Sequence, residues 1–200
     1  MIGSTSTPGG PAVLDYDLEA GRYDETRGGL RRAVAAADAV RRLVPGGTLL
    51  DVACGTGLVT RELAGRGLRV LGVETSAGMA RIAAGRADVV LGDARTLPVR
   101  DGSVDAVTTI WLLHLLDDAR PVIAEAARVL RPGGVFVTTV DKRAAHGPGG
   151  RREPSDRAEL VVEEAARHGL RPSGESSFVG HGQGRPSPDP VFRLLAFTRS

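Results

Sequence analysis

Short runs of apolar residues alternate with amphipathic segments along most of this chain. Apolar runs of about four to eight residues are typical of strands buried in a parallel sheet, and apolar positions spaced three or four apart indicate helices. The pattern predicts strands at 48–53, 69–74, 88–91, 104–110 and 134–140, and helices at 26–44, 58–65, 76–86, 118–130 and 156–168.

Two further apolar segments, near 176–179 and 191–198, predict strands at the end of the chain. The segment His181–Pro190 between them is too short for a crossover helix, so these strands should pair antiparallel as a hairpin. The predicted fold is therefore α/β, with a doubly wound, Rossmann-like, seven-stranded and mostly parallel sheet and an antiparallel C-terminal hairpin.

Composition and charge narrow the classes of protein. The chain has 200 residues, of which 42% are hydrophobic, enough for one compact domain. We expect this domain over 16–200, with an N-terminal cap region at 16–45, after a flexible tail at 1–15 that lacks the pattern of a signal peptide. A net charge of +2 gives no electrostatic footprint for nucleic acid, and no apolar run approaches the roughly 20 residues of a membrane span. Because Cys54 is the single cysteine, an internal disulfide and a cysteine metal site are excluded, and we expect a cytoplasmic protein without a metal.

The segment Leu49–Gly57 carries the most informative motif. Its apolar run ends in Asp51, a turn of small residues follows, and an amphipathic segment begins directly afterwards, which is the pattern of a buried strand, a glycine turn and a helix. Gly55 and Gly57 have no side chains, so a ligand can approach the backbone amides of this turn closely. Close packing of the helix on the sheet is the alternative reason for such glycines.

Acidic residues end the next two predicted strands. Glu74 follows Gly57 by 17 residues, about the spacing at which a βαβ unit places a carboxylate beside a ribose. Asp93 follows the third strand. Ligands of open α/β sheets bind at the carboxyl ends of the strands, so both side chains are candidates for ligand binding, with a polar strand end and a loop cap as the alternatives.

Together with the Leu-Arg-Pro-Gly-Gly turn at 130–134, these motifs resemble those of class I S-adenosylmethionine-dependent methyltransferases of the small-molecule type. The similarity runs from about Tyr16 to the C-terminus, and the Asp-x-x-Cys-Gly-Thr-Gly signature begins at Asp51. Two positions depart from the family pattern: Ala53 replaces a common glycine, and Glu74 stands where aspartate is also frequent. We expect the alanine to be tolerated if its φ stays negative, and a longer carboxylate still reaches a ribose.

The resemblance implies S-adenosylmethionine as the cofactor. Glu74 would then bind the ribose hydroxyls, Asp93 the exocyclic amine of adenine, and Asp51 the amino group of the methionine moiety. Tyr16 and Arg22 would close over the methionine end, with Arg22 pairing its carboxylate, although packing of the N-terminal arm explains them equally well. The expected cofactor site comprises Asp51, Ala53, Cys54, Gly55, Gly57, Glu74, Thr75, Met79, Asp93, Ala94, Ile110, Tyr16 and Arg22.

The acceptor is expected over the carboxyl ends of the fourth and fifth strands, beside Trp111, Tyr23, Asp141 and His181. The walls available there are largely apolar, which favours a small, partly hydrophobic molecule over a nucleic acid or a protein chain. His114 borders the transferred methyl group in this architecture and is a candidate general base, with a structural histidine as the alternative. No subdomain is inserted after the fifth strand, so residues 12–27 should act as a mobile cover.

We therefore expect a methyltransferase that moves a methyl group from S-adenosylmethionine to an oxygen or nitrogen of a small molecule. It should work as a monomer or homodimer, without nucleic acid and without a membrane. An NAD(P)-dependent oxidoreductase on a Rossmann sheet is the main alternative, weakened because Thr60 occupies the third glycine position of Gly-x-Gly-x-x-Gly. A non-catalytic module that binds an adenosyl ligand is the other alternative.

Overall fold

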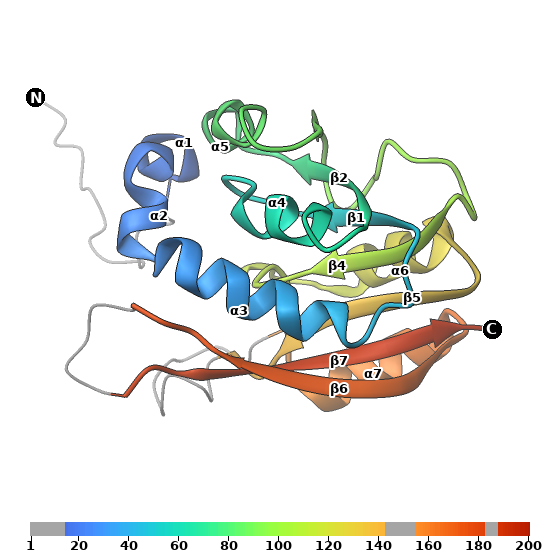
Figure 1. The fold of residues 1–200 in the computed structure, drawn as a ribbon. Coiled ribbons are helices and arrows are strands. Elements are labelled where there is room, and N and C mark those ends of the chain that lie inside the picture. Colours follow the sequence, from blue (N-terminus) through green and yellow to red (C-terminus); the bar gives the residue numbers. More distant parts are fainter. Residues whose placement is uncertain (1–14, 143–154, 183–187) are drawn as a thin grey trace, which may run out of the picture.

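The sheet has the strand order that the sequence pattern predicts. A computed structural model describes residues 15–142, 155–182 and 188–200 and contains a seven-stranded sheet of order β3-β2-β1-β4-β5-β7-β6 (Figure 1). The first five strands pair in parallel, and β7 pairs antiparallel with both β5 and β6. The doubly wound sheet with an antiparallel C-terminal hairpin is therefore confirmed. The strands are β1 (Thr48–Val52), β2 (Arg69–Glu74), β3 (Val89–Leu91), β4 (Val104–Thr109), β5 (Leu130–Val140), β6 (Leu170–Val179) and β7 (Val191–Arg199).

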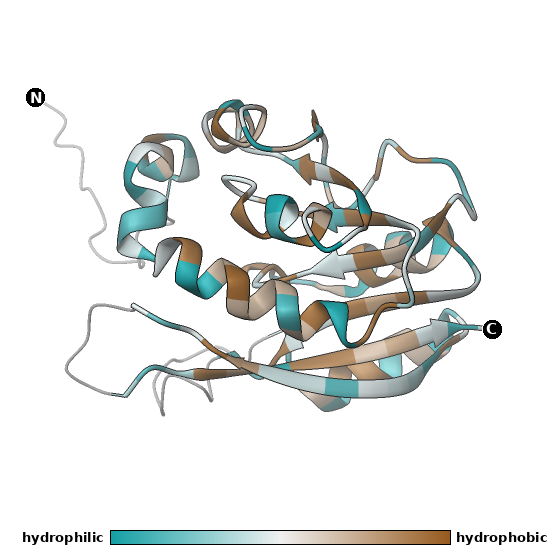
Figure 2. Ribbon diagram, in the orientation of Figure 1, coloured by the Kyte–Doolittle hydropathy of each residue, from teal (hydrophilic) through white to brown (hydrophobic). Residues whose placement is uncertain are grey.

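Helices cover both faces of the sheet. Side chains of α3 (Gly29–Arg41) and α4 (Leu58–Ala64) join one apolar core, and those of α6 (Arg120–Val129) and α7 (Ala158–Arg167) join the other. Coverage of both faces explains why β1 and β4 are buried along nearly their whole length. Figure 2 shows hydrophobic and hydrophilic positions interleaved along α3, as expected for a helix with one buried face. In the described part of the chain, no helix combines the length and hydrophobicity that crossing a membrane requires.

Three short helices form an N-terminal arm before α3. They are α1 (Tyr16–Glu19), η1 (Ala20–Arg22) and α2 (Tyr23–Thr26). The arm lies beside α5 (Ala77–Ala83), next to which Figure 1 labels α1. Apart from Asp15, the predicted flexible tail lies outside the described residues.

Some element boundaries differ from the predicted ones. The predicted helix 26–44 is shorter in the structure, where α3 begins at Gly29 and ends at Arg41, because Gly28 takes a left-handed conformation with φ of 82° and separates α3 from α2. The predicted strand 176–179 begins six residues earlier, at Leu170, because β6 pairs with β7 along its full length. The added residues contain Pro172 and Gly174 and are mostly exposed. An edge strand of this composition shows no alternation of apolar and polar residues, so no pattern along the chain indicated it.

A non-glycine residue in the left-handed region follows each of the three central strands β1, β4 and β5. These residues are Ala53, Trp111 and Asp141, with φ of 59°, 62° and 52°. The condition under which Ala53 was expected to be tolerated, a negative φ, is therefore not met, because this residue is left-handed in the turn after β1. Strained backbone of this kind concentrates where a fold supports function, and all three residues lie at the same edge of the sheet.

Candidate active site

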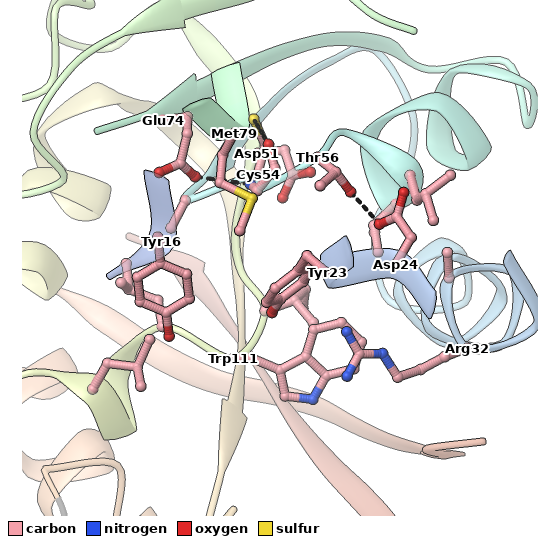
Figure 3. A pocket seen from close by; sticks show the side chains of 18 of the residues that line it. Tyr16, Tyr23, Asp24, Arg32, Asp51, Cys54, Thr56, Glu74, Met79 and Trp111 are labelled. Atoms are coloured by element: carbon pink, nitrogen blue, oxygen red, sulfur yellow. Dashed lines mark hydrogen bonds between the residues drawn. The ribbon is translucent and has the colours of Figure 1, made fainter. Parts of the chain in front are cut away.

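A cavity of about 260 Å³ opens at the carboxyl ends of β1, β2 and β4 (Figure 3). Its walls come from the turn after β1, the tip of β2, the segment after β4 and the N-terminal arm. Nine of the residues that the sequence predicted for the cofactor line it, namely Tyr16, Asp51, Ala53, Cys54, Gly55, Glu74, Thr75, Met79 and Ile110. Two of the predicted substrate residues, Tyr23 and Trp111, line it as well.

The two glycines of the turn after β1 have different roles. Gly55 lines the cavity, its φ is 59°, and a Cβ added to it would meet no atom within 4 Å. Gly57 is the N-cap of α4 with φ of 77°, and an added Cβ would come within 3.0 Å of the Ala83 Cβ on α5. Gly55 therefore leaves the backbone open to a ligand, whereas Gly57 allows α4 and α5 to pack closely.

Glu74 is held in a fixed orientation at the tip of β2. Its side chain faces the cavity, and the residue is only 6% exposed. Oε2 accepts a hydrogen bond from the Gly55 backbone N–H at 2.8 Å, and Oε1 accepts from those of Thr75 and Ser76 at 2.9 Å each. Hydrogen bonds from backbone amides to a carboxylate are among the stronger ones in proteins, so the carboxylate is pre-positioned before any ligand arrives.

Asp51 is a buried carboxylate that faces no positive charge. It is 3% exposed, and its oxygens accept hydrogen bonds from the hydroxyls of Thr60 at 2.7 Å and Thr108 at 2.9 Å. Burial raises the pKa of Asp51 to about 6, and no cation of the described residues pairs with it. A buried carboxylate of this kind is costly unless a ligand with a positive charge compensates it. The nearby Cys54 thiol stays neutral, because burial raises its pKa as well.

Asp17 makes the first contact between the N-terminal arm and the rest of the protein. One of its carboxylate oxygens accepts hydrogen bonds from the Ser76 hydroxyl and from the Gly78 backbone N–H, each at 2.6 Å. Both donors belong to the start of α5. This contact places Tyr16, the neighbouring residue, in the wall of the cavity.

The second contact of the arm is made by Asp24. Its Oδ1 accepts a hydrogen bond from the Thr56 hydroxyl at 2.5 Å, and its Oδ2 pairs with Arg86 at 2.7 Å. Because Thr56 lies in the glycine turn, the arm and this turn are joined directly. The contact holds Tyr23 over the cavity, where the side chains of Tyr16 and Tyr23 approach with ring centroids 6.2 Å apart (Figure 3).

Three of the predicted cofactor residues outside the lining make other contacts or lie on the surface. Asp93 pairs with Arg95 through two nearly parallel hydrogen bonds of 3.0 and 2.6 Å. The Arg22 side chain is 67% exposed and lies 3.5 Å from Glu19. Ala94 is partly buried next to Asp93. The roles predicted for these residues remain predictions.

Trp111 forms an aromatic wall of the cavity, on the side away from Glu74. Its indole packs edge-on against Phe178 and Phe192, at centroid distances of 5.4 and 5.6 Å. The guanidinium of Arg32 lies over the Trp111 ring, 4.1 Å from the ring centroid. Figure 3 shows Arg32 and Trp111 together at the side of the cavity away from Glu74. Aromatic walls of this kind are rigid and suit flat or apolar ligands.

His114, Asp141 and His181 lie outside the lining of the cavity. The Nε2 of His114 is 2.6 Å from the ammonium nitrogen of Lys142, the residue that follows Asp141. Asp141 accepts a hydrogen bond from the Ala158 backbone N–H at 3.1 Å, at the start of α7. His181 lies 3.4 Å from Asp189 and so is engaged at the end of the hairpin.

Sequence reasoning missed several wall residues. Arg32 and Asp24 are the polar ones of most consequence, and neither belongs to a motif. On the sequence, Arg32 is one of many arginines of a helix, and only its tertiary contact with Trp111 distinguishes it. The missed residues are Asp24, Gly29, Arg32, Ala33, Thr56, Leu58, Val59, Leu115 and Leu116.

The cavity lies where the strand order reverses, between β1 and β4, which is where doubly wound α/β proteins bind nucleotides and related cofactors. Residues 50–138 match the methyltransferase domain family. A solved structure from Thermotoga maritima, described as an S-adenosylmethionine-dependent methyltransferase and possible histamine N-methyltransferase, shares the fold with a TM-score of 0.72. It is 21% identical, and the match covers 92% of this chain and 98% of that one.

Curated relatives carry the same kind of name. A demethylmenaquinone methyltransferase of Renibacterium salmoninarum is 37% identical over 144 residues, which cover 66% of this chain and 60% of the relative. The demethylmenaquinone methyltransferase of Mycolicibacterium vanbaalenii is 41% identical over 132 residues, which cover 61% of this chain and 56% of the relative. The chain thus spans about three-fifths of the length of these relatives. The family match of residues 50–138 and these relatives support a class I S-adenosylmethionine-dependent methyltransferase, and the solved structure supports its fold.

Proposed function

We propose that this protein transfers a methyl group from S-adenosylmethionine to an oxygen or nitrogen of a small, partly hydrophobic molecule. The observation that carries the proposal is Asp51, a buried carboxylate without a cation that faces the cavity at the end of β1. S-adenosylmethionine presents an ammonium and a sulfonium, and either positive charge would compensate it. Relatives that are named for demethylmenaquinone support a small-molecule acceptor.

The residues of the cavity fit this cofactor. The open space above Gly55 accommodates a ligand that lies directly on the backbone. Glu74 can accept a hydrogen bond from a ribose hydroxyl, because its three backbone donors leave a lone-pair direction of Oε2 unused. Met79 and Ile110 supply apolar surface near it.

The protein's share of the reaction is chiefly positioning. When bound, S-adenosylmethionine supplies a methyl group on a positively charged sulfur, so the electrophile is already activated. Glu74 and Asp51 fix the two ends of the cofactor relative to the sheet, while Tyr16, Tyr23 and Trp111 exclude water from the space where the acceptor meets it. Burial and the neighbouring Tyr23 raise the pKa of Tyr16 to about 12, so its hydroxyl remains a hydrogen-bond donor at neutral pH. Alignment of two bound reactants accounts for a large part of the rate in such reactions.

Binding and turnover measurements test the cofactor assignment. Calorimetry with S-adenosylmethionine, S-adenosylhomocysteine, NAD and NADP should show binding of the first two and none of the dinucleotides. Formation of S-adenosylhomocysteine with a panel of phenols, carboxylic acids and amines then tests turnover. Binding of a dinucleotide without binding of S-adenosylmethionine would contradict the proposal, and cofactor binding without turnover across the panel would favour the non-catalytic module.

One contact bears directly on the oxidoreductase alternative. The Thr60 hydroxyl, at the position of the third glycine, donates its hydrogen bond to Asp51 at 2.7 Å. Thr60, near the start of α4, therefore holds the Asp51 carboxylate in place. A dinucleotide site needs instead a glycine there for close packing of helix and strand, next to a pyrophosphate that an adjacent carboxylate would repel.

A further inference from the structure

A buried hydroxyl of β5 supports the backbone of Trp111. The Trp111 N–H donates a hydrogen bond to the Thr139 Oγ1 at 2.8 Å, and Thr139 is only 1% exposed. The paired residues of β4 and β5 end with Thr109 and Thr138, so this contact begins where the pairing of the two strands ends. A side chain of β5 therefore holds the chain as it leaves β4.

The residue that Thr139 supports has a conformation that most side chains disfavour. The φ of Trp111 is 62°, in the left-handed region. A residue with a Cβ keeps such a conformation only where the surrounding structure holds it. A backbone N–H in the interior also needs an acceptor. Loss of the Thr139 hydroxyl removes that acceptor, and with it one of the contacts that hold the left-handed conformation.

The conformation of Trp111 decides where its indole lies. Successive side chains of an extended strand point to opposite faces of a sheet. Ile110 and Trp111 are consecutive, yet both line the cavity and both pack on the apolar core under α3. The left-handed turn at Trp111 permits this arrangement. It brings the indole against Phe178 and Phe192 and under the guanidinium of Arg32 (Figure 3).

The neighbouring Thr138 offers a close comparison. Val137 belongs, with Trp111, to the apolar core under α3, and Thr139, two residues further along β5, points to the same face. Thr138 points to the other face, where its Oγ1 accepts a hydrogen bond from the Thr109 hydroxyl at 2.7 Å. Both threonines are buried and both hydroxyls are engaged, but only that of Thr139 contacts Trp111.

We propose that Thr139 is a positioning residue for the methyl acceptor, because its hydroxyl fixes the Trp111 backbone and thereby the aromatic wall against which the acceptor lies. The inference rests on the proposed function and adds to it a residue that does not line the cavity. Small displacements of a wall are enough to disturb the alignment of two reactants. Glu74 and Asp51 hold the cofactor from β2 and β1, so the effect of Thr139 is confined to the acceptor.

Fluorescence of the single tryptophan tests the first step of the inference. Thr139→Val preserves the size of the side chain and removes the hydroxyl, whereas Thr139→Ser keeps the hydroxyl. Thr139→Val should shift the emission maximum of Trp111 and increase its quenching by acrylamide. Thr139→Ser should restore the spectrum of the unaltered protein. Thr138→Val, which removes the neighbouring hydroxyl, is the matched control and should leave the spectrum unchanged.

Binding of an acceptor analogue tests the second step. The protein is saturated with S-adenosylhomocysteine and titrated with 4-nitrophenol, a small aromatic molecule with one hydroxyl, in a calorimeter. Thr139→Val should bind 4-nitrophenol about tenfold more weakly, the scale of one lost hydrogen bond. Thr139→Ser and Thr138→Val should bind it as the unaltered protein does. The affinity for S-adenosylhomocysteine should be the same in all four proteins.

Three outcomes overturn the inference. They are an unchanged Trp111 spectrum in Thr139→Val, equal binding of 4-nitrophenol by Thr139→Val and Thr138→Val, and no binding of 4-nitrophenol by the unaltered protein with S-adenosylhomocysteine bound. If Thr139→Val does not fold, Thr139→Cys takes its place, because a thiol is a weak acceptor. Failure of the proposed function gives a different result, since S-adenosylhomocysteine itself would then not bind.

Discussion

The Gly55 backbone amide donates a hydrogen bond to Glu74 Oε2 at 2.8 Å and so joins the turn after β1 to the tip of β2. The two residues come from neighbouring parallel strands and meet at the bottom of the cavity. One carboxylate thereby fixes the shape of the glycine turn and presents its remaining lone pair to a ligand. In the proposed function, structural and binding roles therefore coincide in Glu74, and a substitution there should have two measurable effects.

Glu74→Ala should weaken S-adenosylmethionine binding by roughly 1.5–3 kcal/mol, because the charge-assisted hydrogen bond to the ribose is lost. The melting temperature should also fall, because three backbone N–H groups lose their acceptor. Calorimetry measures the first effect and thermal unfolding the second. Asp93→Ala is the comparison: it should lower affinity only if Asp93 binds the adenine. Unchanged affinity of Glu74→Ala would exclude the ribose assignment.

The N-terminal arm should control access to the cofactor. Deletion of residues 1–27 removes Tyr16 and Tyr23 from the wall of the cavity, so turnover should be abolished while circular dichroism shows a folded sheet. A finer test releases the arm without deleting it. In the double variant Asp17→Ala/Asp24→Ala, the contacts to α5 and to the glycine turn are lost, and the cofactor should dissociate about tenfold faster.

Glu25→Ala is the control for the arm, because this exposed carboxylate lies on the same short helix. Its dissociation rate, measured by stopped-flow fluorescence, should match that of the unaltered protein. Full activity of the truncated chain would show that the arm does not cover the active site.

Ala53 is expected to destabilise the protein relative to glycine. A left-handed conformation costs a residue with a Cβ about 1–2 kcal/mol, and the greater freedom of glycine in the unfolded chain offsets part of the gain. Ala53→Gly should therefore raise the free energy of unfolding by about 0.5–1 kcal/mol in a denaturant titration. Ala35→Gly in the helix α3 is the control and should lower it by a similar amount. A loss of stability in Ala53→Gly would mean that the φ of 59° carries no strain.

The sequence predicted those parts of the molecule that follow from periodicity and from residues at strand ends. Parallel strands buried on both faces read as apolar runs, which is why the order of βα units and the positions of Asp51, Gly55 and Glu74 were correct. The strand predicted for β6 was too short, because an exposed edge strand needs no apolar pattern.

Contacts between distant segments were beyond sequence reasoning. Asp24 meets Thr56 only because the arm folds back over the sheet, and Arg32 meets Trp111 only because α3 packs on the same apolar core as Trp111. The conformation of Ala53 was also hidden, because nothing in the residue type indicates a positive φ. We predicted Arg22, next to Tyr23, as a cofactor residue, yet Arg32 on the helix α3 is the arginine that lines the cavity.

His114 can be tested as a base separately from its contact with Lys142. If the acceptor is a hydroxyl that is neutral in solution, His114→Ala should lower kcat by about 10²–10⁴-fold and leave cofactor affinity intact. His114→Gln keeps a hydrogen-bond acceptor for the Lys142 ammonium, so recovery of activity in this variant would indicate positioning instead of proton transfer. His168→Ala, which removes a histidine paired with Glu164 on α7, is the control. Normal turnover of His114→Ala would leave alignment as the mechanism and favour an amine or a preformed anion.

Asp51 should make cofactor binding depend on pH. Its pKa in the folded apo protein is about 6, above the usual 3.8, so its proton is held more tightly in the folded state than in the unfolded one. The free energy of unfolding of the apo protein therefore falls as pH rises between about pH 4 and pH 6. Above that range the full cost of the buried charge is present. Asp51→Asn should therefore stabilise the apo protein at pH 7, by an amount on the order of 2 kcal/mol.

Cofactor binding should show the opposite dependence. A bound ammonium or sulfonium favours the ionised carboxylate, so S-adenosylmethionine affinity should rise about tenfold between pH 5 and pH 7, with release of a proton. Calorimetry in two buffers of different ionisation enthalpy counts that proton. In Asp51→Asn the affinity should be lower, by about 10–100-fold at pH 7, and nearly independent of pH. An equal pH dependence in both proteins would show that another group titrates. It would contradict the prediction that a positive charge of the bound cofactor lies next to Asp51.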